Sequence, residues 1–271
     1  MDDACDLRRW VTATIYGMIG LSKVAEATHP AMDSGIIIEE LHWGNRYFLA
    51  MQEPAGYLMS FCGGDFDRHG DDNRWTDNLP GNEDDRRIMV KPVNAAAQYC
   101  FIMAQAAVVR MTRQNDPAYA RKCEEAARRC LEWNVREKAA RTTTDLGAAA
   151  AACTEMYRTF REPRFAELAA DFGRQVMARQ VTDSPDEQTH VRGFFRTSEK
   201  DARPLKDIYR GPWGLLGLCS LAETFPDHGD AQRWRAAIGM YCGEYLVPMV
   251  RRNAFGMRKA HHAAKMQAAD L

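Results

Sequence analysis

Residues 116–120 read Asp-Pro-Ala-Tyr-Ala, and residues 162–166 read Glu-Pro-Arg-Phe-Ala, 46 positions further along the chain. In both segments a proline falls in the first turn of a run with helical periodicity, where its missing N–H costs nothing. An aromatic residue two positions later opens the apolar face. A repeat of this length corresponds to two helices and two turns, so it predicts stacked helical hairpins, arranged as an open solenoid or a closed toroid.

Apolar residues recur at helical spacing over most of the chain, and alternating strand-like runs are nearly absent. The sequence therefore predicts an all-α protein, with residues 1–271 in one domain. The expected helices cover 6–28, 36–52, 92–113, 116–137, 145–160, 163–180, 207–224 and 229–247, with a further one near 258–269.

The connections between these helices are very unequal in length. Tight turns near 114–116 and 161–162 contrast with long polar stretches at 53–90 and 181–206. Long loops inside compact domains are usually functional or disordered. The first stretch is rich in Gly, Asp and aromatic residues, which favours a functional loop, whereas the second fits either a lid or a solvated excursion.

The composition limits the possible classes of function. The chain has 36 basic and 37 acidic residues, a formal net charge of −1, which gives no electrostatic case for a nucleic acid or an anionic membrane as partner. No apolar run reaches the roughly 18 residues of a membrane span, and no signal-peptide pattern is visible. Eight cysteines without a C-x-x-C pair fall mostly at apolar helical positions, so we expect buried free thiols.

Motifs for nucleotide binding, serine hydrolysis and zinc proteolysis are missing from the sequence. Residues 65–70, Asp-Phe-Asp-Arg-His-Gly, imitate the start of a calcium loop, but position twelve is Thr76 instead of a bidentate glutamate. His261 and His262 are adjacent and would point about 100° apart on a helix. We therefore expect neither a metal ion nor another cofactor.

Two carboxylates three residues apart, Asp3 and Asp6, stand at the start of the first expected helix. Such residues can cap free backbone N–H groups at the positive end of a helix. They can also perform acid/base chemistry. The segment alone leaves both interpretations open.

Three motifs give the chain a resemblance to the family 9 glycoside hydrolases, over roughly residues 1–180. The segment Asp3-Ala4-Cys5-Asp6 is similar to the family's Asp-Ala-Gly-Asp motif, and the run from Glu40 to Gln52 is similar to its Glu-x-x-Trp-Gly-x-x-x-x-Leu-x-Met-Gln helix. The family's Asp-His-Ser-x-Trp loop, later Arg and Lys-Pro-Gly-Ser resemble Asp71-Asp72-Asn73-Arg74-Trp75, Arg86 or Arg87, and Lys91-Pro92-Val93-Asn94, with Asp72 in place of His. The resemblance implies antiparallel helical hairpins in an (α/α)6 toroid, complete or incomplete.

The resemblance also implies a chemistry, namely hydrolysis of β-1,4-linked glucan or a related oligosaccharide with inversion. Asp6 then looks like the general base on the attacking water, and Asp3 like its partner on the same water. In the family the general acid is a Glu on a C-terminal Asn-Glu segment, which this chain lacks. The resemblance therefore predicts a chain truncated at both ends with little hydrolytic activity, from a parent protein that is secreted or periplasmic.

Sugar binding needs aromatic platforms with polar rims. The substrate-binding candidates are Asp72, Trp75, Arg86, Tyr209 and Trp213. Helical periodicity instead predicts core positions for Trp43, Trp133 and Trp234. Two other functions stay open, namely another toroid glycosidase or sugar epimerase, and a non-catalytic helical-repeat module that binds a protein.

Overall fold

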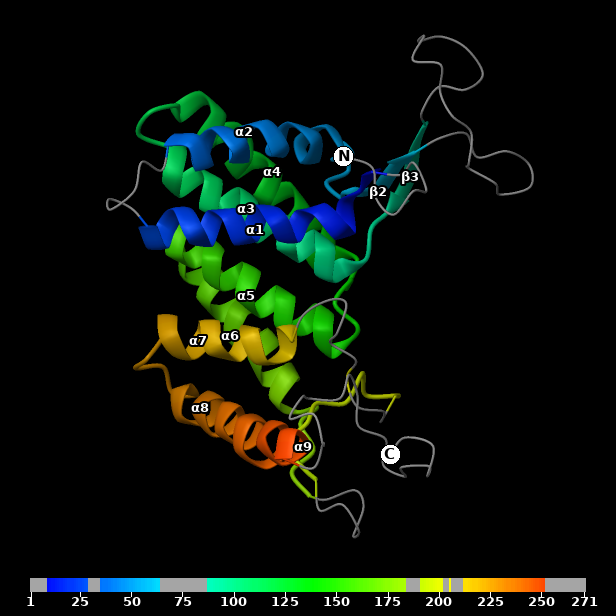
Figure 1. Ribbon diagram of the computed structural model, residues 1–271, viewed down its shortest axis with the longest axis vertical. Helices are drawn as coiled ribbons and strands as arrows, with labels where there is room; N and C mark the ends of the chain where they lie inside the picture. The colour runs from blue at the N-terminus through cyan, green and yellow to red at the C-terminus, as the bar shows by residue number, and fades with distance from the viewer. Residues whose placement is uncertain are drawn as a thin grey trace, which may run out of the picture. The chain divides into compact units, whose positions relative to one another are not determined.

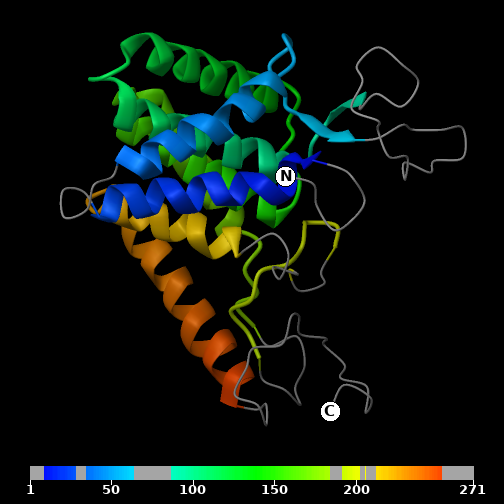
Figure 2. The ribbon, with the colours of Figure 1, turned by 45° about the horizontal axis from the view of Figure 1, so that its top comes forward.

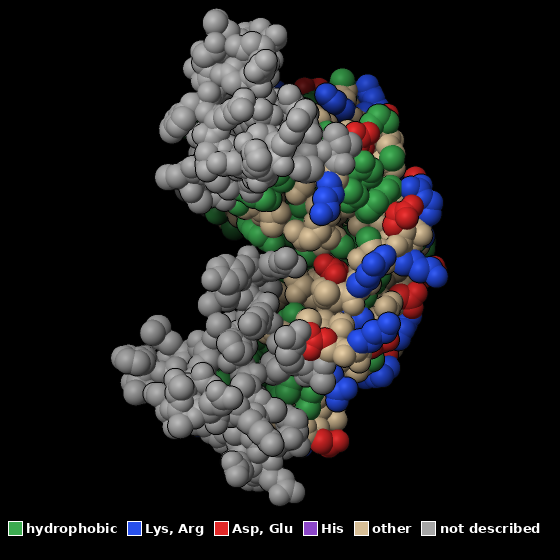
Figure 3. Space-filling model, turned by 90° about the vertical axis from the view of Figure 1, so that its right-hand side faces the viewer, with side chains coloured by type: hydrophobic (Ala, Val, Ile, Leu, Met, Phe, Trp, Pro, Cys, Tyr) green, Lys and Arg blue, Asp and Glu red, His purple; other side chains and the backbone are tan. Residues whose placement is uncertain are grey.

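The computed structural model describes residues 9–28, 35–63, 87–183, 191–201, 205 and 212–251. By its internal contacts the chain divides into two compact units, Met1–Glu137 (unit 1) and Lys138–Leu271 (unit 2). No helix among the described residues is long and apolar enough to cross a membrane. Basic and acidic side chains are interspersed on the described surface seen in Figure 3.

Unit 1 contains four long helices with a small sheet at one end (Figures 1 and 2). The helices are α1 (Val11–Thr28), α2 (Gly35–Ala50), α3 (Ala95–Thr112) and α4 (Pro117–Arg136). Strands β1 (Arg9–Trp10), β2 (Met59–Gly63) and β3 (Arg87–Pro92) form an antiparallel sheet in the order β1-β2-β3.

This sheet corrects two expectations from the sequence. Helix α1 begins at Val11 instead of residue 6, because Arg9 and Trp10 pair with β2. The long stretch 53–90 contains β2 and the first residues of β3. In β3 the apolar residues Ile88, Met89 and Val90 are consecutive, so no period-2 alternation marks this strand.

The start of α4 matches the prediction from the 116–120 segment. Asp116 is the N-cap, its side chain accepts a hydrogen bond from the Tyr119 N–H at 3.0 Å, and Pro117 occupies the first turn. Helix α3 packs against α1 and α4 and is buried along almost its whole length. The core of unit 1 therefore lies around α3.

Unit 2 contains α5 (Thr143–Phe160), α6 (Pro163–Met177), α7 (Trp213–Thr224) and α8 (Ala231–Met240). A π-helical turn, η1 (Tyr241–Leu246), continues α8 and leads into α9 (Val247–Arg251). The single helix predicted over 229–247 is thus interrupted by a π turn, and the helix predicted to start at 207 is described only from Trp213. The helix expected near 258–269 lies outside the described residues.

Short connections join the helices into antiparallel hairpins, with α3–α4 in unit 1 and α5–α6 and α7–α8 in unit 2. The two long connections come after α2 in unit 1 and after α6 in unit 2. Within each unit they lie at the helix ends that face away from the short hairpin turns. The predicted all-α hairpin architecture is therefore confirmed, with the small sheet as an addition.

Candidate active site

Strand β1 brings the segment after Asp6 next to the start of the long stretch that carries Trp75. Arg9 pairs with Cys62 and Trp10 with Phe61, and the Trp10 and Phe61 ring centroids are 4.4 Å apart. The chain continues from Gly63 into residues 64–86 and returns in β3. Asp3, Asp6, Asp72, Trp75 and Arg86 themselves lie outside the described residues.

Side chains from the neighbouring helices hold β1 in place. The Tyr47 hydroxyl on α2 donates a hydrogen bond to the Arg9 carbonyl, and the Thr14 hydroxyl on α1 donates to the Trp10 carbonyl at 2.8 Å. Burial raises the pKa of Tyr47 well above its usual range, so its hydroxyl keeps the proton that it donates. These contacts fix β1, which begins three positions after Asp6 in the sequence.

In unit 2, the described part of the second long stretch is bonded to the helix ends. The Thr143 N–H and hydroxyl donate to the carbonyls of Thr197 and Arg196 at 2.9 and 2.5 Å. The Val181 N–H donates to the Phe194 carbonyl at 2.8 Å. Residues 191–201 thus lie against the start of α5 and the segment after α6, which does not fit a freely solvated excursion.

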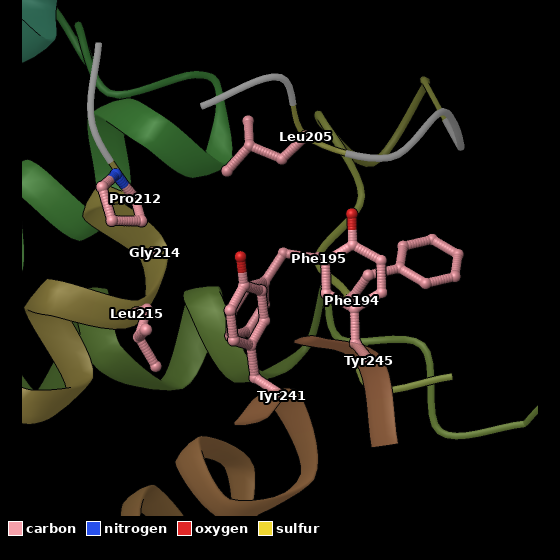
Figure 4. Close-up of a pocket in the computed structure, with 8 residues that line it drawn as sticks. All are labelled: Phe194, Phe195, Leu205, Pro212, Gly214, Leu215, Tyr241 and Tyr245. Carbon is pink, nitrogen blue, oxygen red and sulfur yellow. The ribbon is translucent and has the colours of Figure 1, made fainter. Parts of the chain in front are cut away.

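A small aromatic pocket of about 10 Å³, room for about one water molecule, lies beside this stretch (Figure 4). Tyr241 stacks on Phe195 with ring centroids 5.4 Å apart, and the hydroxyls of Tyr241 and Tyr245 point the same way. Both tyrosines come from the π turn η1, a helix type that is frequent at functional sites. The remaining walls are apolar and include Pro212, Gly214 and Leu215.

Trp213 is the one residue of the predicted site that the structure describes, since Tyr209 lies outside. It opens α7 and is only 7 % exposed. Its backbone passes so close to α5 that a Cβ on Gly147 would lie 2.1 Å from the Trp213 carbonyl oxygen. Little of the indole is therefore open to a ligand in this state, and its substrate-binding role stays a prediction.

Arg179, just after α6, is a residue that sequence reasoning missed. It is 7 % exposed, and its Nε and Nη1 atoms are buried without a hydrogen-bond partner among the described residues. Burial lowers the pKa of Arg179, while the charges of Glu199 and Asp145 act in the opposite direction. A single arginine after a helix has no motif, so the sequence holds no signal for it.

The three tryptophans predicted for the core differ in how exposed their side chains are. Trp234 is fully buried, as predicted, and Trp133 is partly exposed. Trp43 is 59 % exposed, so its predicted core position is wrong. The physical reason is that α2 buries the opposite face, through Leu41, Asn45 and Phe48.

Metal-ligand clusters are not found in the described part of the chain, where no three His, Cys, Asp or Glu side chains are placed to hold an ion. The seven cysteines in that part are free thiols, of which Cys100, Cys123, Cys130 and Cys153 are buried. Cys5 lies outside it.

Comparison with solved structures finds several family 9 enzymes with the same fold. An endoglucanase named J30 is 17 % identical, with a TM-score of 0.59 over 92 % of this chain and 46 % of its own. A thermostable endoglucanase mutant from Alicyclobacillus acidocaldarius is 16 % identical, with a TM-score of 0.59 over 94 % and 48 %. The cellulase Cel9M of C. cellulolyticum, solved with cellobiose, is 15 % identical, with a TM-score of 0.52 over 85 % and 49 %.

This chain thus spans about half the length of the structures it matches. A comparison with curated proteins found no match. Among family profiles, "Glycosyl hydrolase family 9" matches residues 2–171, which is more than half of the chain and includes the segments of both Asp3 and Trp75. The helical hairpins are therefore those of the (α/α)6 toroid, and the chain belongs to glycosyl hydrolase family 9.

Proposed function

We propose that this chain forms part of the catalytic domain of a glycoside hydrolase that cleaves β-1,4-linked glucan or a related oligosaccharide. Family membership supports glycosidase chemistry, and the matched structures include endoglucanases and a cellulase solved with cellobiose. The observation that carries the proposal is the pairing of Arg9 and Trp10, which follow Asp6 in the sequence, with β2, the strand that leads into residues 64–86.

In the proposed mechanism Asp6 is the general base and removes a proton from the attacking water. Asp3 holds the same water, and its negative charge raises the proton affinity of Asp6. An inverting mechanism needs space for this water between the base and the anomeric carbon. The proposal assigns no residue of this chain as the general acid.

The glucan would bind next to these carboxylates, with a sugar ring on Trp75 and its hydroxyl groups on Asp72 and Arg86. We assign Tyr209 and Trp213 to a further sugar unit.

A substrate with an activated leaving group tests the base separately from the acid. Dinitrophenyl β-cellobioside needs no protonation of its leaving group, so its hydrolysis depends on the base and on sugar binding. We expect Asp6→Asn to lower kcat about 10²- to 10⁴-fold, the usual contribution of general acid/base catalysis. Asp227→Asn, on an exposed turn of unit 2, serves as the control and leaves kcat unchanged. Equal rates for wild type and Asp6→Asn would refute the assigned base.

A further inference from the structure

The outward face of α2 carries two large apolar side chains that are mostly exposed. Ile36 is 73 % exposed and Trp43 is 59 % exposed. They are seven residues apart, which is two helical turns and about 10 Å along the axis. Single exposed apolar residues are ordinary, but a large aromatic next to a second apolar side chain marks a candidate binding surface.

Trp43 and Ile36 form one side of an open groove of about 610 Å³ between α2 and the start of α4. This volume lies within the range for ligand-binding sites, and the groove is open to solvent, so a ligand can extend beyond it. All the lining residues belong to unit 1 and to described helices.

The floor of the groove is held by buried polar contacts. The rings of His42 and Tyr119 are 4.4 Å apart, and the Tyr119 hydroxyl accepts a hydrogen bond from Asn45 at 2.9 Å. Asn45 also donates to the Gln105 side chain at 3.0 Å. The His42 Nε2 atom is buried and has no hydrogen-bond partner among the described residues. A buried polar atom without a partner costs free energy, and a ligand hydroxyl that reached Nε2 would supply the missing hydrogen bond.

The rim of the groove carries charged groups of both signs that are not committed elsewhere. Glu39, Glu40 and Arg46 form no ion pair or hydrogen bond with any described residue. On α4, by contrast, Glu124 and Arg128 pair at 2.7 Å. The three rim groups are therefore available to a ligand.

We propose that this groove is a second, non-catalytic binding site for a β-glucan chain. The C–H faces of the sugar rings stack on Trp43, and the hydroxyl groups donate to Glu39 and Glu40 and accept from Arg46. A neutral polyhydroxyl chain serves acceptors and donors at once, whereas a charged ligand would be repelled by one of the two signs. The choice of glucan rests on the proposed function, but the site does not involve Asp3 or Asp6.

Binding to insoluble cellulose tests the site, measured as the partition of the full chain between pellet and solution. We expect Trp43→Ala to weaken binding about tenfold and Trp43→Phe, which keeps an aromatic face, to retain most of it. Glu40→Ala should weaken binding to a smaller extent. Leu216→Ala, at a side chain of unit 2 that is 40 % exposed, is the control and should bind as wild type does. Because Trp43 is exposed, its substitution should leave the unfolding curve nearly unchanged.

The outcomes separate this site from the proposed catalytic site. Asp6→Asn should bind cellulose normally, so a failure of the assigned base in the kinetic test would leave this inference standing. Equal binding by wild type and Trp43→Ala, or no binding by wild type, would overturn it. A changed oligomeric state in Trp43→Ala with unchanged cellulose binding would also overturn it and would identify the groove as a protein contact.

Discussion

Arg179 shows how one side chain can be costly to the folded state. A buried guanidinium keeps its charge, and burial without a partner costs free energy unless a hydrogen bond or counter-ion compensates. The charges of Glu199 and Asp145 offset part of this cost, although Asp145 also accepts hydrogen bonds from the N–H and hydroxyl of Thr142 at 2.9 and 2.8 Å. The Nε and Nη1 atoms of Arg179 nevertheless stay buried without a hydrogen-bond partner among the described residues.

We expect Arg179→Met, which keeps the apolar stem and removes the charge, to raise the free energy of unfolding by about 1 kcal/mol or more. Urea unfolding measures this change. Arg233→Met, at a side chain that is 65 % exposed, is the matched control and should stay within about 0.5 kcal/mol of wild type. A loss of stability in Arg179→Met would show that its N–H groups have partners after all.

The buried thiols make stability depend on pH in the alkaline range. Burial raises the pKa of Cys123 to about 11 and that of Cys153 to about 12, against about 8.5 for an exposed thiol. The unfolded chain therefore loses these protons at lower pH than the folded chain. The stabilisation is fully present below about pH 8.5 and is lost as the pH rises toward the folded values.

Between pH 9 and 10 each such thiol should lower the free energy of unfolding by about 1.4 kcal/mol per pH unit. Urea unfolding at several pH values gives the slope. Cys153→Ala should show a shallower slope than wild type, which isolates the thiol from other groups that titrate there. Parallel slopes for the two proteins would contradict the account.

At the scale of elements, α5 and α7 approach each other through glycines. A Cβ on Gly147 would lie 2.1 Å from the Trp213 carbonyl oxygen, and one on Gly217 would lie 2.4 Å from the Gly147 carbonyl oxygen. These contacts are to backbone atoms, which cannot turn aside as a side chain could. Glycine is therefore required where the two helices cross.

We expect Gly147→Ala to lower the free energy of unfolding by about 2 kcal/mol, since the helices must separate. Gly20→Ala on α1 is the matched comparison, because a Cβ there meets nothing within 4 Å. That change should instead raise stability by about 0.5–1 kcal/mol through the better helix propensity of alanine. Thermal unfolding of the two variants would disprove the close-approach argument if both shifted in the same direction.

The elements that the sequence predicted well are those set by local rules. The starts of α4 and α6 follow from Pro117 and Pro163 in a first helical turn, and the apolar period marks most of the long helices. The pairing of β1 with β2 joins residues about fifty positions apart, and no local pattern reports such a contact. The π turn η1 was missed for a similar reason. Its backbone hydrogen bonds span five residues instead of four, and the apolar spacing of the sequence does not resolve this difference.

The site shows the same division between motif and tertiary contact. The spacing of Asp3 and Asp6 left capping and acid/base roles open, and the motif resemblance gave Asp3, Asp6 and Trp75 their proposed roles. Trp43 belongs to a helical motif and was predicted to be buried, yet a period fixes only which residues share a face. Which face meets the core depends on the packing of α2 against α1 and α3, and this packing leaves Trp43 exposed.

At the scale of the whole molecule, the family is established and the reaction is a proposal. The family profile matches residues 2–171 of this chain. The chain itself covers only about half of each matched structure. The structure describes two compact units. A single domain over residues 1–271 stays a prediction. The central claim is therefore the chemistry at the Asp3/Asp6 segment.

The stereochemistry of the first product tests that claim most directly. If Asp6 activates a water opposite the leaving group, hydrolysis of dinitrophenyl β-cellobioside must give α-cellobiose first. Proton NMR in the first minutes, before the anomers equilibrate, distinguishes the two forms. We predict an initial α-anomer signal that is lost in Asp6→Asn. An initial β-anomer, or an α-anomer formed equally fast by Asp6→Asn, would contradict the account.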